Sequence, residues 1–160
     1  MRPEELMPGD FVKFTDYDGS VYACKVEGIY SRNELFLTGD EGLELDLFDD
    51  YLKRVEPLEI TEKFLLKNGF AKGQDVSGLF DEYVNDVYVL RTDKDKFGMS
   101  RTIVRVVPFF DLGFIVRAER TCNDPKLGRH EFYVHRPNTQ YIHQIQQTCR
   151  LCGIEIDWKL

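Results

Sequence analysis

Residues 43–47 read Leu43-Glu44-Leu45-Asp46-Leu47, a strict alternation of leucine with acidic side chains. Side chains on a β-strand point to opposite faces in turn, so this period of two gives one apolar and one charged face. The turn-forming residues Gly39-Asp40-Glu41-Gly42 precede the stretch. It therefore predicts a short strand whose leucines face a core, and this strand decides the interpretation of the first part of the chain.

Four further strand candidates surround this stretch within the first 56 residues. They are apolar-rich runs separated by turn signals, and they cover residues 11–14, 21–26, 34–38 and 53–56. Five short strands with tight turns favour a small closed or half-closed barrel. The opening run Leu6-Met7-Pro8-Gly9-Asp10-Phe11-Val12 supports a barrel, because it resembles the L-x-x-G-D-x-V strand with which many small barrels begin. We predict an SH3-like β-barrel over residues 1–56, with a plain β-meander as the alternative.

An α+β domain is predicted for residues 57–160, so the whole chain is mainly β with α. Thr61 can cap a short linking helix over residues 61–68, and Asn68-Gly69 can end it. Phe70 lies where a hydrophobic contact back to such a helix is common. Strand-like runs then follow at residues 82–91, 102–107, 113–119 and 131–135. Antiparallel pairing of these runs is expected.

A second helix is predicted over residues 140–152, with Thr139 as its N-cap. Its apolar residues recur at spacings of three and four and form one stripe, consisting of Tyr141, Ile142, Ile145, Cys149 and Cys152. Gly153 is placed to end the helix, and residues 154–158 alternate like a terminal strand. The helix is therefore expected to pack on one face of the antiparallel sheet.

The composition excludes several classes of protein. The 160 residues are 42% hydrophobic and 31% charged, which is typical of a globular protein rather than a disordered one. No apolar run approaches the roughly 20 residues of a membrane helix, and the N-terminus lacks the apolar stretch of a secretory signal. We therefore expect a cytoplasmic protein that does not associate with membranes and whose four cysteines are free thiols.

Charge is distributed unevenly along the chain. Residues 1–56 carry 6 basic and 14 acidic side chains, a net charge of −8, whereas residues 57–160 carry 15 and 14, a net charge of +1. An acidic first part repels the phosphates of nucleic acids. The acidic clusters within it, at residues 40–41, 44–46 and 49–50, are interpreted as a solvated charged face.

The cysteines and histidines carry a weaker signal for chemistry. Cys149 and Cys152 have C-x-x-C spacing, but they lie at the end of the predicted helix, where the dipole does not favour a thiolate. We interpret the pair as core packing and predict neither a metal site nor a cofactor. An enzyme that uses His143 with the thiol of Cys122 or Cys149 is kept as an alternative. Phosphate-binding loops and the G-x-S-x-G and H-E-x-x-H motifs are absent from the sequence.

Two groups of side chains are candidates for binding. SH3-like barrels often bind peptides through exposed aromatic residues, and Tyr17, Tyr22 and Tyr51 could line such a groove. Arg101, Arg105 and Arg117 lie on predicted strands of the second domain, near phenylalanines. Arginine among aromatic residues is a weak signal for nucleic acid, and an ordinary polar sheet face explains it equally well.

Three phrases of the chain resemble a family of small uncharacterised bacterial proteins, many of them from phage-like or mobile regions. The phrase Tyr141-Ile142-His143-Gln144-Ile145-Gln146, followed by Leu151-Cys152-Gly153, is similar to their ending Y-[VI]-H-[QE]-[LI]-Q…LCG. The phrase from Pro57 to Phe70 and the opening L-x-x-G-D-x-V unit are similar to theirs as well. The resemblance transfers no activity, and it marks Tyr141, His143 and Gln144 as candidate binding residues.

The function predicted from these observations is non-catalytic binding of a protein or peptide. A nucleic-acid-associated accessory protein of phage-like origin is the first alternative, and the His143–thiol enzyme is the second. The oligomeric state stays open, and a dimer through an exposed sheet edge is one possibility.

Overall fold

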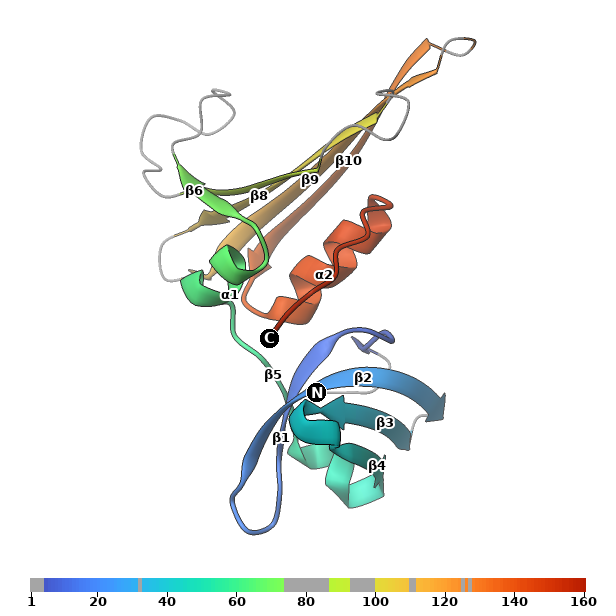
Figure 1. Cartoon of the computed structure of the whole chain (residues 1–160), viewed down its shortest axis with the longest axis vertical. Helices are drawn as coiled ribbons and strands as arrows, with labels where there is room; N and C mark the ends of the chain where they lie inside the picture. The colour runs from blue at the N-terminus through green and yellow to red at the C-terminus, as the bar shows by residue number, and fades with distance from the viewer. Residues whose placement is uncertain are drawn as a thin grey trace. The chain divides into compact units, whose positions relative to one another are not determined.

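A computed structural model describes residues 5–31, 33–73, 87–92, 100–109, 112–124, 126 and 128–160. The chain is mainly β, with two five-stranded antiparallel sheets and a C-terminal helix, as expected for the α+β class (Figure 1). It divides into two compact units: residues 1–59 with 141–147 and 160, and residues 60–140 with 148–159. The two units are described in turn.

The first unit contains a sheet with the strand order β4-β3-β2-β1-β5. Its strands are β1 (Phe11–Thr15), β2 (Val21–Ser31), β3 (Glu34–Gly39), β4 (Glu44–Phe48) and β5 (Val55–Pro57). All neighbouring pairs are antiparallel, and β5 returns to lie beside β1. One core is formed by the inward residues of these strands, including Val12, Phe14, Val26, Leu35, Leu37 and Leu47. The leucines of residues 43–47 therefore face this core, with Leu43 and Leu45 partly buried against it.

The predicted SH3-like barrel is not confirmed, because the sheet is open. β4 and β5 are its two edges, and within the described ranges no pairing joins them. The chain between these edges forms the 3-10 helix η3 (Asp49–Arg54) rather than a ladder of strand hydrogen bonds. A barrel closes only when its edge strands pair, so this arrangement is a curled sheet with two free edges.

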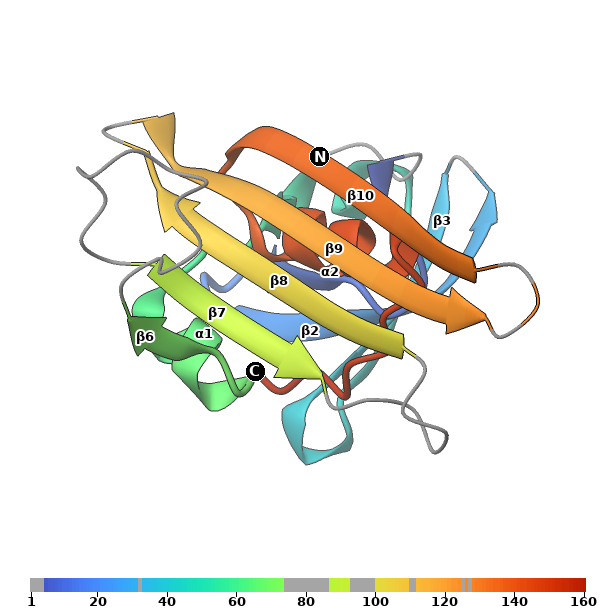
Figure 2. The same cartoon turned by 90° about the horizontal axis from the view of Figure 1, so that it is seen from above.

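The second unit contains a sheet with the strand order β10-β9-β8-β7-β6 (Figure 2). Its strands are β6 (Ala71–Gly73), β7 (Val87–Thr92), β8 (Ser100–Pro108), β9 (Phe114–Asp124) and β10 (Gly128–Thr139). β7 covers the C-terminal part of the strand predicted at 82–91, whose residues 82–86 lie outside the described residues. Val116 and Ala118 of β9 are buried at alternate positions, whereas β8 buries four consecutive residues, Val104 to Val107.

The short helix α1 (Glu62–Lys67) forms as the sequence predicted. The Thr61 side chain accepts a hydrogen bond from the backbone N–H of Phe64 at 3.1 Å, which caps the first turn. Gly69 adopts φ 82° after the helix, a backbone conformation that favours glycine. The Phe70 N–H then donates to the Leu65 carbonyl at 3.0 Å, so the chain turns back and buries the Phe70 side chain.

Helix α2 (Ile142–Leu151) starts two residues later than predicted, and Thr139 is not its N-cap. Thr139 ends β10, where its hydroxyl donates to the Arg136 carbonyl at 3.1 Å. The first turn is instead closed by Gln144, whose Oε1 accepts from the Tyr141 N–H at 3.2 Å. The last turn contacts the second sheet, because the Cys152 thiol lies 3.5 Å from the Ala118 carbonyl on β9.

The strand predicted at residues 154–158 is not formed. Gly153 ends α2 with φ 66°, and residues 154–160 have no regular secondary structure. Their alternating pattern is real, since Ile154 is buried and Glu155 is exposed, but Ile154 donates to the Cys149 carbonyl at the end of α2 and Lys159 is bound by a side chain rather than by a strand. Among the residues that the structure describes, no helix is long and apolar enough to cross a membrane.

Candidate functional site

Two of the three tyrosines predicted to bind peptide come together on the first unit. Tyr17 lies in the turn between β1 and β2, and Tyr51 lies on η3. Their rings meet edge to face, with centroids 5.1 Å apart and an interplanar angle of 84°. Both are exposed to solvent, Tyr17 by 60% and Tyr51 by 41%. Large exposed aromatic rings in contact are typical of binding surfaces rather than of a core.

Arg54 holds this pair in place. Its guanidinium lies over the Tyr17 ring, 3.7 Å from the centroid. Its Nη1 donates to the carbonyls of Asp16 at 3.0 Å and Thr15 at 3.3 Å, so the side chain is anchored on the β1–β2 turn. One face of the Tyr17 ring is thus covered by a cation–π contact. We call Tyr17, Tyr51 and Arg54 the tyrosine cluster.

The turn that carries Tyr17 is fixed by local hydrogen bonds. The Asp16 N–H donates to the Ser20 carbonyl at 2.8 Å, and the Gly19 N–H donates to the Asp16 carbonyl at 3.1 Å. Gly19 has φ 87°, which a residue with a Cβ rarely adopts. The sequence Asp16-Tyr17-Asp18-Gly19 therefore forms the tight turn that it predicted, and the turn presents the tyrosine ring outward.

Carboxylates flank the tyrosine cluster in the sequence on both sides. The backbone N–H of Ser20 donates to Asp18 and lowers the pKa of that carboxyl. On η3, the hydrogen bond and charge of Lys53 lower the pKa of Asp50. Both groups are therefore ionised at neutral pH and add negative charge near the cluster, where Lys53 pairs with Asp50 and Arg54 is the other cation.

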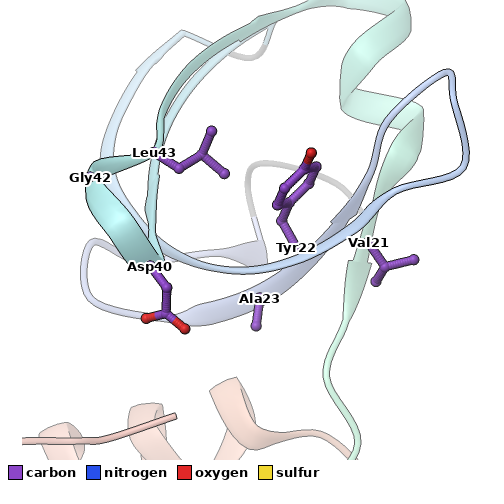
Figure 3. A pocket seen from close by; sticks show the side chains of 6 residues that line it. All are labelled: Val21, Tyr22, Ala23, Asp40, Gly42 and Leu43. Carbon is purple, nitrogen blue, oxygen red and sulfur yellow. The ribbon is translucent and has the colours of Figure 1, made fainter.

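Tyr22 serves a different role from the other two tyrosines. It is half-buried, stacks on Phe14 at a centroid distance of 6.5 Å and packs against the core of the first unit. It also lines an open pocket of about 470 Å³ together with Val21, Ala23, Asp40, Gly42 and Leu43 (Figure 3). Figure 3 shows Tyr22 and Leu43 on one side of the strands and Ala23 and Asp40 on the other. This pocket offers a single carboxylate and no group of catalytic side chains.

The residues marked on the helix by the resemblance are engaged with each other. The Tyr141 and His143 rings stack with centroids 5.9 Å apart and an interplanar angle of 9°. His143 is only 6% exposed, Tyr141 is half-buried, and Gln144 closes the first helical turn. These positions give the motif a structural role, and its part in binding remains a prediction.

The residues that sequence reasoning missed are Gln146, the last residue of the same phrase, and Gln147 directly after it. Gln146 is fully buried; its Oε1 accepts from the Phe11 N–H and its Nε2 donates to the Gly9 carbonyl, both at 2.9 Å. Gln147 donates through Nε2 to Asp10 Oδ2 at 2.8 Å. A signal for the burial of Gln146 was present in the sequence, because it lies four residues after Ile142 and three before Cys149, on the same side of the helix as the apolar stripe.

Two of the three arginines of the nucleic-acid alternative, Arg105 and Arg117, contact neighbours on the second sheet. Arg105 is 7% exposed and pairs with Glu119 at 2.9 Å. Arg117 lies opposite Arg105 in the β8–β9 register, and its guanidinium is 4.9 Å from the Tyr133 ring centroid. Arg101 is exposed and lies four residues before Arg105, on the same face of β8.

The thiols are poorly suited to nucleophilic attack. Burial raises the pKa of Cys149 to about 12 and that of Cys24 to about 11, and it also raises the pKa of Cys152. The thiolate is the reactive form, so these groups stay protonated and inert at neutral pH. Cys122 is half-buried and lies opposite His130 in the β9–β10 register. In the described parts of the chain, no cluster of His, Cys, Asp or Glu is arranged to hold a metal ion.

No family model, curated protein or solved structure matches this chain. The function of the chain is therefore inferred from the geometry of the molecule itself.

Proposed function

We propose that this protein is a non-catalytic binding protein, and that the tyrosine cluster of its first unit binds an extended, positively charged peptide segment. The observation that carries this proposal is the edge-to-face contact of Tyr17 and Tyr51, both exposed, with Arg54 anchored behind Tyr17. Rings that are already fixed lose little conformational freedom when a ligand docks. A prebuilt aromatic surface on one side of the first unit suits a short extended ligand.

The sign of the ligand charge follows from the acidic character of the same unit. Residues 1–56 carry a net charge of −8, and Asp18 and Asp50 lie on the two elements that supply the tyrosines. Complementary charge speeds the encounter and discriminates against acidic partners. Arginine or lysine in the peptide is therefore favoured over glutamate.

We also propose that the first unit is related to SH3-like folds and that the protein is bacterial and cytoplasmic. The return of β5 to β1 and the η3 turn between β4 and β5 support a relation to SH3-like folds with an open rather than closed sheet. The resemblance to small bacterial proteins of phage-like regions supports a bacterial origin. The four free cysteines support a reducing compartment, the cytoplasm.

The alternatives have less support. A nucleic-acid surface would need available arginines, whereas Arg105 is largely buried against Glu119. An enzyme that used His143 with a thiol would need a thiolate near neutral pH, whereas burial holds the pKa of Cys149 at about 12.

The proposal is tested with short proline-rich peptides that differ only in carrying arginine, a neutral residue or glutamate at the variable positions. Fluorescence anisotropy of labelled peptides is expected to rise saturably with the arginine peptide and to decrease with added salt. Tyr17→Ala and Tyr51→Ala should each weaken binding about tenfold, as for aromatic residues that anchor an interface.

Tyr30→Ala is the matched control, because Tyr30 is a 66% exposed tyrosine of the same unit outside the cluster. It should bind the arginine peptide as the wild type does. Equal binding by all three tyrosine variants, or no preference for arginine over glutamate, would remove the tyrosine cluster as the site.

A further inference from the structure

The residues 154–159 that follow α2, which we call the C-terminal segment, are held by side chains of the second unit. The Asn68 amide binds both polar groups of one backbone residue: its Oδ1 accepts from the Lys159 N–H at 2.7 Å, and its Nδ2 donates to the Lys159 carbonyl at 2.8 Å. A neighbouring β-strand would offer the same donor and acceptor. At Lys159 a single side chain thus replaces a strand as the hydrogen-bond partner of the backbone.

The amide is held in its binding orientation by helix α1. Asn68 Nδ2 also donates to the Phe64 carbonyl at 2.9 Å, which accepts from the Asn68 backbone N–H at 3.1 Å as well. Asn68 is the C-cap residue that directly follows α1, and it is only 8% exposed. This third hydrogen bond fixes the amide whether or not the segment is bound.

Two aromatic rings beside Asn68 receive the residue before Lys159. The Trp158 ring lies parallel to Phe64, with centroids 5.7 Å apart and an interplanar angle of 6°. It also lies 6.4 Å from Phe70 at 26°. Phe64 and Phe70 are both buried, and the Schellman-type turn at Gly69 places Phe70 beside the helix. We call Phe64, Asn68 and Phe70 the clamp.

These contacts define what the clamp recognises. The rings select an aromatic side chain, and the Asn68 amide selects a following residue that has a backbone N–H, which excludes proline. The lysine side chain itself is not selected, because Lys159 is exposed. The segment makes no regular strand or helix. It is attached at its start by Ile154, which is buried and donates to the Cys149 carbonyl at 2.9 Å, and at its end by the clamp.

We propose that the clamp is a peptide-binding site for an extended segment with a tryptophan followed by a non-proline residue, and that the C-terminal segment is its resident ligand. The site lies on the second unit and is independent of the tyrosine cluster and of the function proposed for it. A segment of this chemistry supplied in trans competes with the resident one for the same two rings and the same amide.

The chain contains one tryptophan, which makes a direct experiment possible. Full-length Trp158→Ala protein is spectroscopically silent on excitation of tryptophan, so a synthetic peptide of residues 154–160 carries the sole tryptophan signal. Its emission should shift to the blue and its anisotropy rise saturably with added protein. The same peptide with proline in place of Lys159 should not bind.

Matched variants separate the clamp from a nonspecific surface. Adding Asn68→Ala to the Trp158→Ala protein should weaken binding about tenfold or more, because two hydrogen bonds to the peptide are lost. Leu66→Ala is the control, since Leu66 is an exposed residue of α1 outside the clamp. The proposal is overturned if folded Trp158→Ala protein, verified by circular dichroism, gives no saturable signal, or if the proline peptide binds equally well.

If Trp158→Ala does not fold, the fluorescence of Trp158 in the otherwise wild-type protein tests whether the clamp holds the segment. In the wild-type background, Asn68→Ala should shift the emission of Trp158 to the red and increase its quenching by iodide, whereas Leu66→Ala should change neither. Unchanged emission in the Asn68→Ala protein would show that the clamp does not hold the segment.

Discussion

Side-chain amides hold distant backbone segments in both units of this molecule, and two of them, Gln146 and Asn68, do so in different surroundings. Gln146 binds Gly9 and Phe11 from a fully buried position, whereas Asn68 binds Lys159 beside partly exposed residues. Each amide supplies one donor and one acceptor to the backbone. Loss of the Gln146 amide leaves the buried Phe11 N–H without this partner, whereas water can reach the exposed Lys159 backbone once the Asn68 amide is lost. The first contact therefore fixes the fold of its unit, and the second holds a segment that can be exchanged.

The largest expected effect is that of Gln146→Met, which keeps the shape of the side chain and removes both hydrogen bonds. The Phe11 N–H and the Gly9 carbonyl would be left without these partners, so the free energy of unfolding should fall by about 3 kcal/mol. Urea unfolding followed by circular dichroism measures the change. Gln144→Met, on the same helix but half-buried, should lose about 1 kcal/mol or less. Equal losses in both variants would contradict a special role for Gln146.

A smaller loss is expected for Asn68→Ala, about 1.5 kcal/mol, because water can solvate the Lys159 backbone once the segment is released. The same urea titration measures this change in the free energy of unfolding, so that it can be compared directly with the change in Gln146→Met. If Asn68→Ala costs as much as Gln146→Met, the segment is part of the rigid fold and the contrast between the two amides disappears.

The smallest effect is a dependence of stability on alkaline pH. Burial raises the pKa of Cys24 to about 11 and that of Cys149 to about 12, above the ordinary thiol value of 9.0 in each case. Above pH 9 the unfolded chain loses these protons first, so the folded state binds more protons and stability falls as pH rises toward 11 and 12. The slope of unfolding free energy against pH measures this.

Variants show which unit responds to alkaline pH. Cys24→Ala should reduce the slope through the first unit, and Cys149→Ala should reduce it through the second. Because alanine also leaves a cavity, the slope is compared rather than the absolute stability. A slope in the double variant equal to that of the wild type would mean that other groups govern alkaline unfolding.

Local patterns allowed much of the fold to be predicted from the sequence. The alternation of Leu43, Leu45 and Leu47 correctly identified a strand with one apolar face, and Thr61 and Gly69 correctly bounded α1. Such signals depend on neighbours within a few residues, so they are visible in one chain. The choice of pairing partners is not local, which is why the pattern favoured a closed or half-closed barrel whereas the sheet is open.

The candidate site was only partly predictable for the same reason. Tyr17 and Tyr51 could be selected as exposed aromatic residues, but Tyr22 faces Phe14 because of its register opposite that residue on β1. Likewise, the alternation of residues 154–158 suggested a strand, whereas Asn68 takes the place of a strand partner. Asn68 binds the backbone of Lys159, 91 residues later in the chain, and no periodic pattern in the sequence indicates a contact over that separation.

The place of Gln146 in the chain sets the order in which the first unit can be completed during synthesis. Gln146 lies 135 residues after Phe11, so the ribosome has made all five strands of the first sheet long before their last hydrogen-bond partner exists. Until then the Gly9 carbonyl and the Phe11 N–H face water or a chaperone. The first unit therefore begins to form early on the ribosome and reaches its final stability only after the second sheet has been translated.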